Sequence, residues 1–322
     1  MRLVLALVIA LAAPAQEAKP VAPNHMFYDP ARRQVVMLAA SPQTGLETLW
    51  AWDGKRWTQI PAGAGPVARE LSGAAYDSAR RRLVLYGGAA VKPRQGRLED
   101  TWEWDGKRWA ESKVLGPHPG PRDHHAMAFD SARGRVVLFG GLKEGDSPDP
   151  HTWEWDGARW SKVASTGASG GGGHNGLVYD AARRLTILFA GFGGQSRVHN
   201  QTWAWDGKEW RQLSPQGPLP SPRYRHRMAF DSDKEVIVLF GGLLTRQAPA
   251  EAGDTWLWDG KQWREAQPAG GIAPAPRASH VMAYDPTRRR TVLYGGHSFD
   301  GRTGVTYDDT WEWDGHSWTR AN

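Results

Sequence analysis

The sequence predicts an all-β protein, a six-bladed β-propeller with four antiparallel strands in each blade. Three observations support this fold class. A motif of the form T-W-x-W-D-G-x-x-W occurs six times, once with Leu in place of Thr. Its copies are about fifty residues apart, a period typical of propellers and solenoids. Short β-type runs bounded by turn residues fill each interval.

The first tryptophan of each motif marks one repeat. These residues are Trp50, Trp102, Trp153, Trp203, Trp256 and Trp311. All 18 tryptophans of the chain belong to the six motifs. A single binding site would need its aromatic residues in one or two copies. Tryptophans that fill the same positions in every copy therefore indicate a structural repeat.

A second block precedes each tryptophan motif and supplies the first two strands of the unit. It reads PRDHHAMAFDSARGRVVLFGG from Pro121. We number positions backwards from the Asp that closes the first run, here Asp130, so that positions minus one, minus three and minus five share a strand face. Large residues lie on that face and small ones, such as Ala128, on the other. This alternation suits blades that are covered on both sides by their neighbours.

Turn residues join the runs into hairpins. Asp-Gly follows the second tryptophan of every motif, and this dipeptide is typical of tight hairpins because a type I′ turn needs positive φ. D-x-x-R segments form the turn between the first two runs. The last motif ends at Trp318, so each blade is expected to be contiguous, and the ring to close between blades one and six without an exchanged strand. The expected blades are 23–61, 66–114, 119–164, 170–214, 220–267 and 274–320.

The PR-x-x-H start, the paired glycines after the second strand and the tryptophan after the third strand resemble Kelch repeats. The glycine pairs are Gly87-Gly88, Gly140-Gly141, Gly241-Gly242 and Gly295-Gly296. Blades one and four depart from the pattern, with Ala39-Ala40 and Ala190-Gly191. The resemblance, which extends to the central domain of galactose oxidase, implies the propeller fold. It does not assign a function, because one fold hosts many functions.

The amino terminus has the features of a secretory signal peptide. Arg2 precedes an apolar run over 3–13, and Ala13-Pro14-Ala15 is a small-x-small cleavage pattern. We expect cleavage after Ala15 and a secreted or periplasmic protein. The apolar run is shorter than the roughly 20 residues of a membrane-spanning helix. No transmembrane segment is therefore expected after cleavage.

The mature chain is expected to have a short linker over 16–22 and a single propeller domain over 23–322, and to be a monomer. It contains no cysteine, which excludes disulfides and thiol chemistry. The resemblance to galactose oxidase therefore does not extend to its activity, which depends on a Cys-Tyr crosslink. The net charge of +6 favours an anionic partner. Export argues against a nucleic acid.

Four arginines at position minus eight are candidate ligand-binding residues. They are Arg69, Arg122, Arg223 and Arg277. As a ring around the central opening, they could bind a carboxylate, a phosphate or a sulfated sugar bidentately. The alternative, which we favour, is that each arginine pairs with an acid just before the T-W motif. Asp100, Asp254 and Asp309 are such acids, and the pairs would join neighbouring blades.

Position minus five holds His125, His226 and His280, and imidazole is a common metal ligand. The equivalent residues elsewhere are Asn24, Ser72 and Asn175. This set indicates a position that needs a hydrogen-bonding side chain. We therefore expect buried, hydrogen-bonded histidines, and neither a metal nor another cofactor. His124, beside His125, remains a candidate ligand-binding residue.

Blade four differs most from the other repeats. GASGGGGHNG from Gly167 supplies the candidates His174 and Asn175, and GFGGQSRVHN supplies Arg197 and His199. Glycine there either opens a pocket or marks a degenerate blade, and both interpretations stay open. These segments lie on the loop face, which carries the PR-x-x-H starts and the loops after the glycine pairs. The D-x-x-R and Asp-Gly turns lie on the opposite, hairpin face, where arginines and lysines either form a basic disc or pair locally with Asp.

Two function classes follow. The first is a secreted, non-catalytic scaffold that presents loops to a protein or carbohydrate ligand, as secreted Kelch propellers commonly do. The second is a carbohydrate-active enzyme, because the fold is similar to that of exported six-bladed Kelch mutarotases of sialic-acid type. Acid-base catalysis of that kind could use Arg122, Arg223, Arg277 and His124. No catalytic motif such as H-E-x-x-H or G-x-S-x-G is present, and no catalytic residue is assigned.

Overall fold

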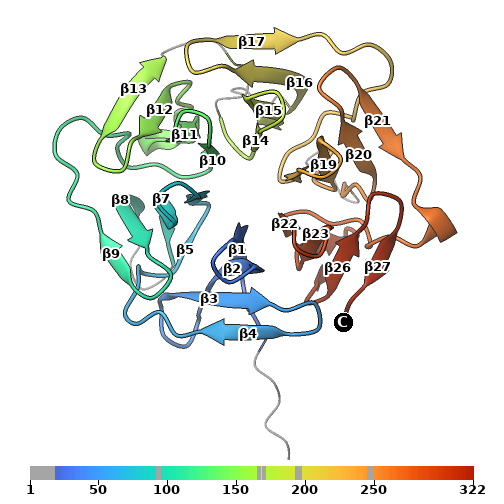
Figure 1. Cartoon of the computed structure of the whole chain (residues 1–322), viewed down its shortest axis with the longest axis horizontal. Helices are drawn as coiled ribbons and strands as arrows, with labels where there is room; N and C mark the ends of the chain where they lie inside the picture. Colours follow the sequence, from blue (N-terminus) through green and yellow to red (C-terminus); the bar gives the residue numbers. More distant parts are fainter. Residues whose placement is uncertain (1–18, 92–95, 165–167, 169–171, 193–197, 245–249) are drawn as a thin grey trace, which may run out of the picture.

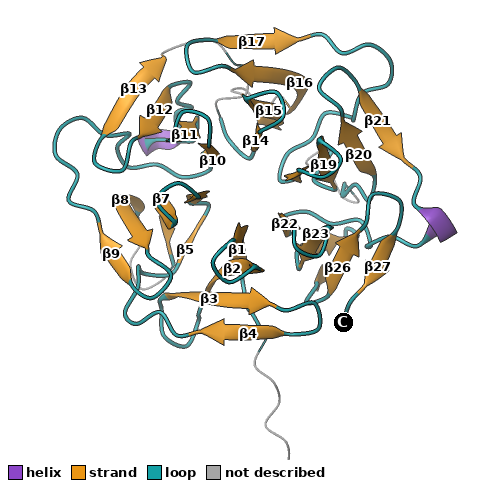
Figure 2. Ribbon diagram, viewed as in Figure 1, coloured by secondary structure: helices purple, strands orange, loops and turns teal. Residues whose placement is uncertain are grey.

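A computed structural model describes residues 19–322, apart from 92–95, 165–167, 169–171, 193–197 and 245–249. Six β-sheets are arranged as blades around a central axis (Figure 1). The described chain is almost entirely strand and loop (Figure 2). The predicted fold class is confirmed, whereas the predicted signal peptide and its cleavage site lie outside the described residues.

The first three blades follow the order of the chain. Blade one has β1 (Pro23–Asp29), β2 (Gln34–Ala40), β3 (Glu47–Trp52) and β4 (Trp57–Ile60). Blade two has β5 (Arg69–Glu70), β6 (Gly73–Asp77), β7 (Arg82–Ala90), β8 (Arg97–Trp104) and β9 (Trp109–Glu111). Blade three has β10 (Ala126–Asp130), β11 (Arg135–Phe139), β12 (Thr152–Trp155) and β13 (Trp160–Ala164).

The remaining blades repeat this plan. Blade four has β14 (Gly176–Asp180), β15 (Leu185–Phe192), β16 (Val198–Trp205) and β17 (Trp210–Leu213). Blade five has β18 (Arg227–Asp231), β19 (Val236–Phe240), β20 (Thr255–Trp258) and β21 (Trp263–Ala266). Blade six has β22 (Val281–Asp285), β23 (Arg290–Tyr294), β26 (Thr310–Trp313) and β27 (Trp318–Arg320). Between these strands lie the hairpin β24 (His297–Phe299) and β25 (Gly304–Thr306) and the 3-10 turns η1 (Glu144–Asp146) and η3 (Ala269–Gly271). No described helix has the length and apolar character of a membrane span.

The second strand of each blade lies at the centre of the core. In β11 the run from Val136 to Phe139 is fully buried, because neighbouring blades cover both faces of the sheet. Strand β10 pairs with β11 so that Met127 lies opposite Leu138. Each apolar cluster joins two neighbouring blades; the one that contains Val84 of blade two also contains Met127 and Trp155 of blade three.

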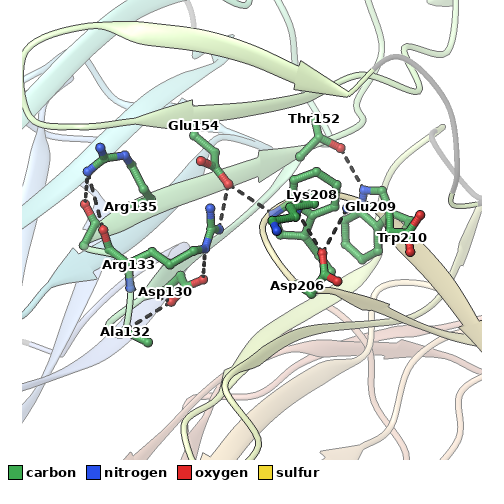
Figure 3. A network of polar contacts seen from close by, with 12 residues as sticks. Asp130, Ala132, Arg133, Arg135, Thr152, Glu154, Asp206, Lys208, Glu209 and Trp210 are labelled. Carbon is green, nitrogen blue, oxygen red and sulfur yellow. Dashed lines mark hydrogen bonds and ion pairs between the residues drawn. The ribbon is translucent and has the colours of Figure 1, made fainter.

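Tryptophan side chains tie each blade to the one before it. The indole Nε1 of Trp210, the third tryptophan of its motif, donates a hydrogen bond to Thr152 Oγ1 of the preceding blade (2.8 Å; Figure 3). The second tryptophan of that motif, Trp205, donates to Glu154 of the same preceding blade (3.1 Å). Glu154 also accepts from Arg133 (2.7 Å). The Thr and the Glu of T-W-E-W are therefore acceptors for the next blade.

Where the preceding blade lacks the Thr or the Glu, the indole loses its acceptor. Blade one has Leu49 and Ala51 at these positions, and Trp109 and Trp104 of blade two are buried with no hydrogen-bond partner among the described residues. The same relation holds for Ala204 with Trp258 and for Leu257 with Trp313. These exceptions match the positions at which the repeat is broken, which supports the rule.

The Asp-Gly turns and the D-x-x-R turns also meet between blades. Gly207 has φ of 96°, and a Cβ there would lie 2.6 Å from Nε of Arg133 in the preceding blade. Arg133 is fixed by Asp130 (2.6 Å) and Glu154 (Figure 3). Glycine is therefore required both by the turn conformation and by the close approach of the arginine.

Ring closure uses the same contacts as the other blade interfaces. Trp57 of blade one donates to Thr310 of blade six (3.0 Å), and Trp52 donates to Glu312 (2.8 Å). Each four-stranded sheet is built from one contiguous segment, so no strand is exchanged. The predicted mode of closure is confirmed.

Candidate functional site

The four arginines at position minus eight are buried in ion pairs inside their own blades. Arg69 pairs with Asp100 (2.6 Å), Arg122 with Asp149 (2.7 Å), Arg223 with Asp254 (2.6 Å) and Arg277 with Asp309 (2.6 Å). Each Nη1 also donates to the carbonyl oxygen of the first residue of the glycine pair, as Arg69 does to Gly87 (3.0 Å). The expected pairing with acids that precede the T-W motifs is therefore found, but the expectation that the pairs join neighbouring blades is wrong, because each guanidinium holds loops of its own blade.

The histidines at position minus five are buried against the preceding blade. Gly73 and Gly176 provide the space, since a Cβ there would lie 2.6 Å from His125 and 2.5 Å from His226. Only His125 is hydrogen-bonded as expected, to the carbonyl oxygen of Tyr86 (3.1 Å). Neither nitrogen of His226 or His280 has a partner among the described residues, because their rings pack edge-to-face on phenylalanines. The expectation of hydrogen-bonded rings is corrected for these two. The described residues contain no group of three or more His, Asp or Glu side chains that could hold a metal ion.

Position minus six, just before each inner strand, forms a belt around the loop-face end of the channel. Five of its residues have φ between 54° and 62°, a conformation that is uncommon outside glycine. They are Leu71, His124, His174, Arg225 and Ser279. Except for Leu71, each N–H donates to the carbonyl oxygen of its equivalent in the preceding blade, from His124 to Leu71 (2.8 Å) through to Ser279 to Arg225 (3.0 Å). The ring of blades thus imposes the backbone strain at a place where ligands can enter.

Two sequence candidates meet in this belt. The rings of His124 and His174 lie edge-to-face with centroids 4.1 Å apart. Gly173 makes this possible, because a Cβ at that position would lie 2.4 Å from the carbonyl oxygen of His124. The glycine-rich start of blade four therefore serves a close approach between blades. His124 Nδ1 is also hydrogen-bonded to Asp123 (2.7 Å).

Two arginines that the sequence analysis did not select lie beside these histidines. Arg227 Nε donates to the carbonyl oxygen of His280 (3.0 Å), and its Nη2 to that of Asn24 (3.4 Å). Arg225 Nε approaches His174 Nε2 at 3.4 Å. Among the described residues, no carboxylate lies within ion-pair distance of either guanidinium. Burial, with Arg225 nearby, lowers the pKa of Arg227 to about 10.

The imidazoles around this pair are held neutral. Burial, together with His124, Arg225 and Arg227, lowers the pKa of His174 to about 2. Burial and the charge of Arg227 lower the pKa of His25 to about 3. The site therefore contains two cations and neutral hydrogen-bonding groups, an arrangement that suits an anion.

Two adjoining cavities give access to the site. The mouth, a cavity of about 540 Å³, opens on the loop face and is lined by Arg225, Arg227, Asn24, Glu70 and Tyr307 among others. The neck, of about 160 Å³, continues into the channel. His25, Leu71, Ser72, His174 and Arg227 line both cavities. Glu70 and Asp308 also line the mouth, and Asp308 pairs with Lys19 (2.7 Å).

The other described candidates of blade four are Asn175 and His199. Asn175 is buried, its amide has no partner among the described residues, and it lines the neck. His199 contributes its carbonyl oxygen to Arg223 N (3.2 Å). Arg197 lies outside the described residues. The signal that points to Arg225 and Arg227 is variation: positions minus six and minus four differ from blade to blade, whereas the structural positions repeat.

Comparisons with known proteins agree with this architecture. A solved structure titled "Structure of YjhT" superposes with a TM-score of 0.68 at 14% sequence identity, covering 94% of this chain and 98% of that one, which shows the fold alone. Over 87 residues the chain is 31% identical to "Dynein regulatory complex subunit 7" of Chlamydomonas reinhardtii, a match that spans 27% of this chain and 7% of that protein. The family model described as the KLHDC2/KLHL20/DRC7 Kelch-repeats domain matches residues 42–242 and 187–322. The chain therefore belongs to the Kelch-repeat family of β-propellers.

Proposed function

We propose that this Kelch propeller is an exported, non-catalytic binding protein that holds the anionic group of a carbohydrate or protein ligand in its loop-face mouth. The fold itself supports an interaction scaffold. The signal-like amino terminus supports export. The observation that carries the proposal is the pair Arg225 and Arg227, two cations without a carboxylate partner among the described residues, at the floor of a cavity of ligand size.

Desolvation of the two guanidinium groups favours an anion at this site. A guanidinium that leaves bulk water without an opposite charge is unfavourable, and an incoming carboxylate or sulfate removes that penalty. The neutral imidazoles of His25 and His174 can donate hydrogen bonds to the anion, and they carry no charge that would alter the attraction between the anion and the two arginines. A ligand of this kind thus gains more here than from the paired arginines at position minus eight, whose charges are already satisfied.

Calorimetric titration with N-acetylneuraminic acid, glucuronic acid and neutral glucose tests the proposal. We expect saturable binding of at least one acid, no binding of glucose, and an affinity loss of at least about tenfold in Arg227→Met. Arg302→Ala, which removes an exposed arginine of the loop face, should leave the affinity unchanged. Because Arg227→Met also removes the hydrogen bonds to the carbonyl oxygens of His280 and Asn24, thermal unfolding of the unliganded variant is measured alongside to show that it is folded. If no acid binds, or if the two variants lose affinity equally, the proposal is wrong.

One observation favours a second function, a sugar mutarotase. The Asp123 carboxylate is hydrogen-bonded to Nδ1 of His124 and thereby orients a ring that lines the neck. An imidazole held in this way can give and take a proton at Nε2 next to an anchored sugar acid. Proton NMR of the α and β anomers of N-acetylneuraminic acid measures the exchange. Catalysis that is slowed in His124→Gln would support the enzyme, and exchange at the buffer rate would reject it.

A further inference from the structure

The hairpin-face end of the channel forms a further cavity, whose lining differs in chemistry from that of the mouth and the neck. It has a volume of about 400 Å³ and opens on the hairpin face. One aromatic side chain from each of the six inner strands lines it: Tyr28, Tyr76, Phe129, Tyr179, Phe230 and Tyr284. Deeper in the cavity, methionines take over the lining. We call this cavity the aromatic funnel.

Arginines surround the entrance of the aromatic funnel. The first arginine of each D-x-x-R turn is paired, as Arg80 is with Asp77 (2.7 Å), so these guanidinium charges of the predicted basic disc are neutralised locally. The residue after it takes φ between 53° and 62°, and where it is an arginine its side chain is exposed. In blades one, two and four this residue is Arg33, Arg81 or Arg184, and none of the three has an ion-pair partner in the described part of the chain.

The lining of the aromatic funnel places these turns at its entrance. The residue directly after the closing Asp lines the cavity in five blades, as Pro30, Ser78, Ser131, Ser232 and Pro286. Blade five differs, because Asp233 and Glu235 occupy its turn. The unpaired arginines at this turn position thus lie in blades one, two and four, and blade five is acidic there.

We propose that the hairpin face binds an acidic linear segment of a protein partner, with one aromatic or aliphatic side chain inserted in the aromatic funnel. A cavity of about 400 Å³ accommodates one or two apolar side chains, not a folded element. Burying such a side chain stabilises the complex, and methionines and aromatic rings adapt to its shape. Unpaired arginines on the rim complement acidic flanking residues. This site is separate from the loop-face mouth and does not depend on the proposed function.

Selection from a random heptapeptide phage library on the intact propeller tests the proposal. We expect enriched peptides with an apolar residue flanked by two or more Asp or Glu residues. Fluorescence anisotropy of a selected synthetic peptide should then show at least about tenfold weaker binding to the double variant Arg33→Glu, Arg81→Glu. Glutamate is compatible with this turn position, because Glu235 occupies it in blade five with φ of 53°.

Matched variants separate this site from general electrostatics. Lys107→Glu with Lys208→Glu makes the same charge change on the outer Asp-Gly turns and should alter the affinity less than about twofold. Ser78→Trp, an exposed lining residue replaced by a bulky one, should block the aromatic funnel. Arg227→Met should bind the peptide normally. Peptides without acidic flanks, no enrichment, or equal losses in both double variants would overturn the proposal, as would binding of dextran sulfate that depends on Arg33 and Arg81 without any peptide binding.

Discussion

At the scale of single residues, His226 shows that close packing between blades leaves a buried imidazole without a hydrogen bond. Its imidazole lies under Gly176 and against Phe189, with no hydrogen bond among the described residues. Burial lowers its pKa well below 6.5, and the charges of Arg223 and Arg227 lower it further. The folded protein therefore excludes a proton that the unfolded chain accepts below pH 6.5.

This difference predicts acid sensitivity with a definite sign. Because the unfolded state binds more protons, the free energy of unfolding should decrease as the pH falls below about 6.5, by up to about 1.4 kcal/mol per pH unit for each such histidine. In His226→Asn the decrease should be shallower, because asparagine does not bind a proton in this pH range. Asparagine is compatible with this position, since Asn175 occupies it in blade four. Urea denaturation at several pH values between about 6 and 4.5 measures the slope.

The control for this prediction is His316→Asn, which removes an exposed histidine on an Asp-Gly turn. It should leave the slope unchanged. An unchanged slope in His226→Asn as well would contradict the buried, neutral state of His226. The absolute stability of the variant is not the readout, because the smaller side chain also leaves a cavity.

Residues that recur in every blade could be assigned from the sequence, and residues that differ could not. The partners Asp100, Asp254 and Asp309 were predictable because each directly precedes a T-W motif in a blade that has an arginine at position minus eight. Arg225 and Arg227 have no counterpart in the other repeats, and only the curvature of the ring brings them beside His174. Sequence reasoning could find His124 and His174, but not their contact across two blades.

At the scale of elements, the T-W-x-W strand supplies the hydrogen-bond acceptors that hold neighbouring blades together. In blade three, Glu154 accepts from Arg133 of its own blade and from Trp205 of the next. In blade one, Ala51 takes the place of that Glu, and Trp104 of blade two is left without an acceptor. Arg32 lies over the ring of Trp104 with its guanidinium carbon 4.9 Å from the ring centroid, where a carboxylate could reach it.

Ala51→Glu is therefore predicted to stabilise the protein. A carboxylate at position 51 would accept from the indole of Trp104 and from Arg32, which should raise the free energy of unfolding by about 1 kcal/mol. The reverse change, Glu154→Ala, should lower it by about 2 to 3 kcal/mol, because the buried indole of Trp205 and the partly buried guanidinium of Arg133 lose their acceptor. Chemical denaturation of both variants measures these differences. A destabilising Ala51→Glu would show that the acceptor rule does not extend to blade one.

At the scale of the whole molecule, the repeat defines the number of blades and their order. Closure of the ring depends in addition on whether blade six lies beside blade one in space. Nothing in the sequence states that blade six meets blade one, but their motifs carry the same Thr, Glu and Trp positions as the other interfaces. Because one Trp57–Thr310 bond and one Trp52–Glu312 bond form there, the closing interface is built like those between blades two and three and between blades three and four. The repeat thus makes closure predictable, whereas the two ends of the channel are not, since their lining combines one residue from each blade.

A closed ring predicts equal costs at equivalent interfaces. Trp57→Phe, Trp160→Phe and Trp210→Phe each remove an indole N–H that bonds a buried threonine of the preceding blade. Each should therefore lower the free energy of unfolding by a similar amount, about 1 kcal/mol more than Trp109→Phe, whose indole already has no acceptor. All four changes remove similar volume, so the difference isolates the hydrogen bond. If the ring opened readily between blades six and one, Trp57→Phe would cost less than Trp160→Phe, and that result in urea denaturation would show that closure contributes little to the stability of the propeller.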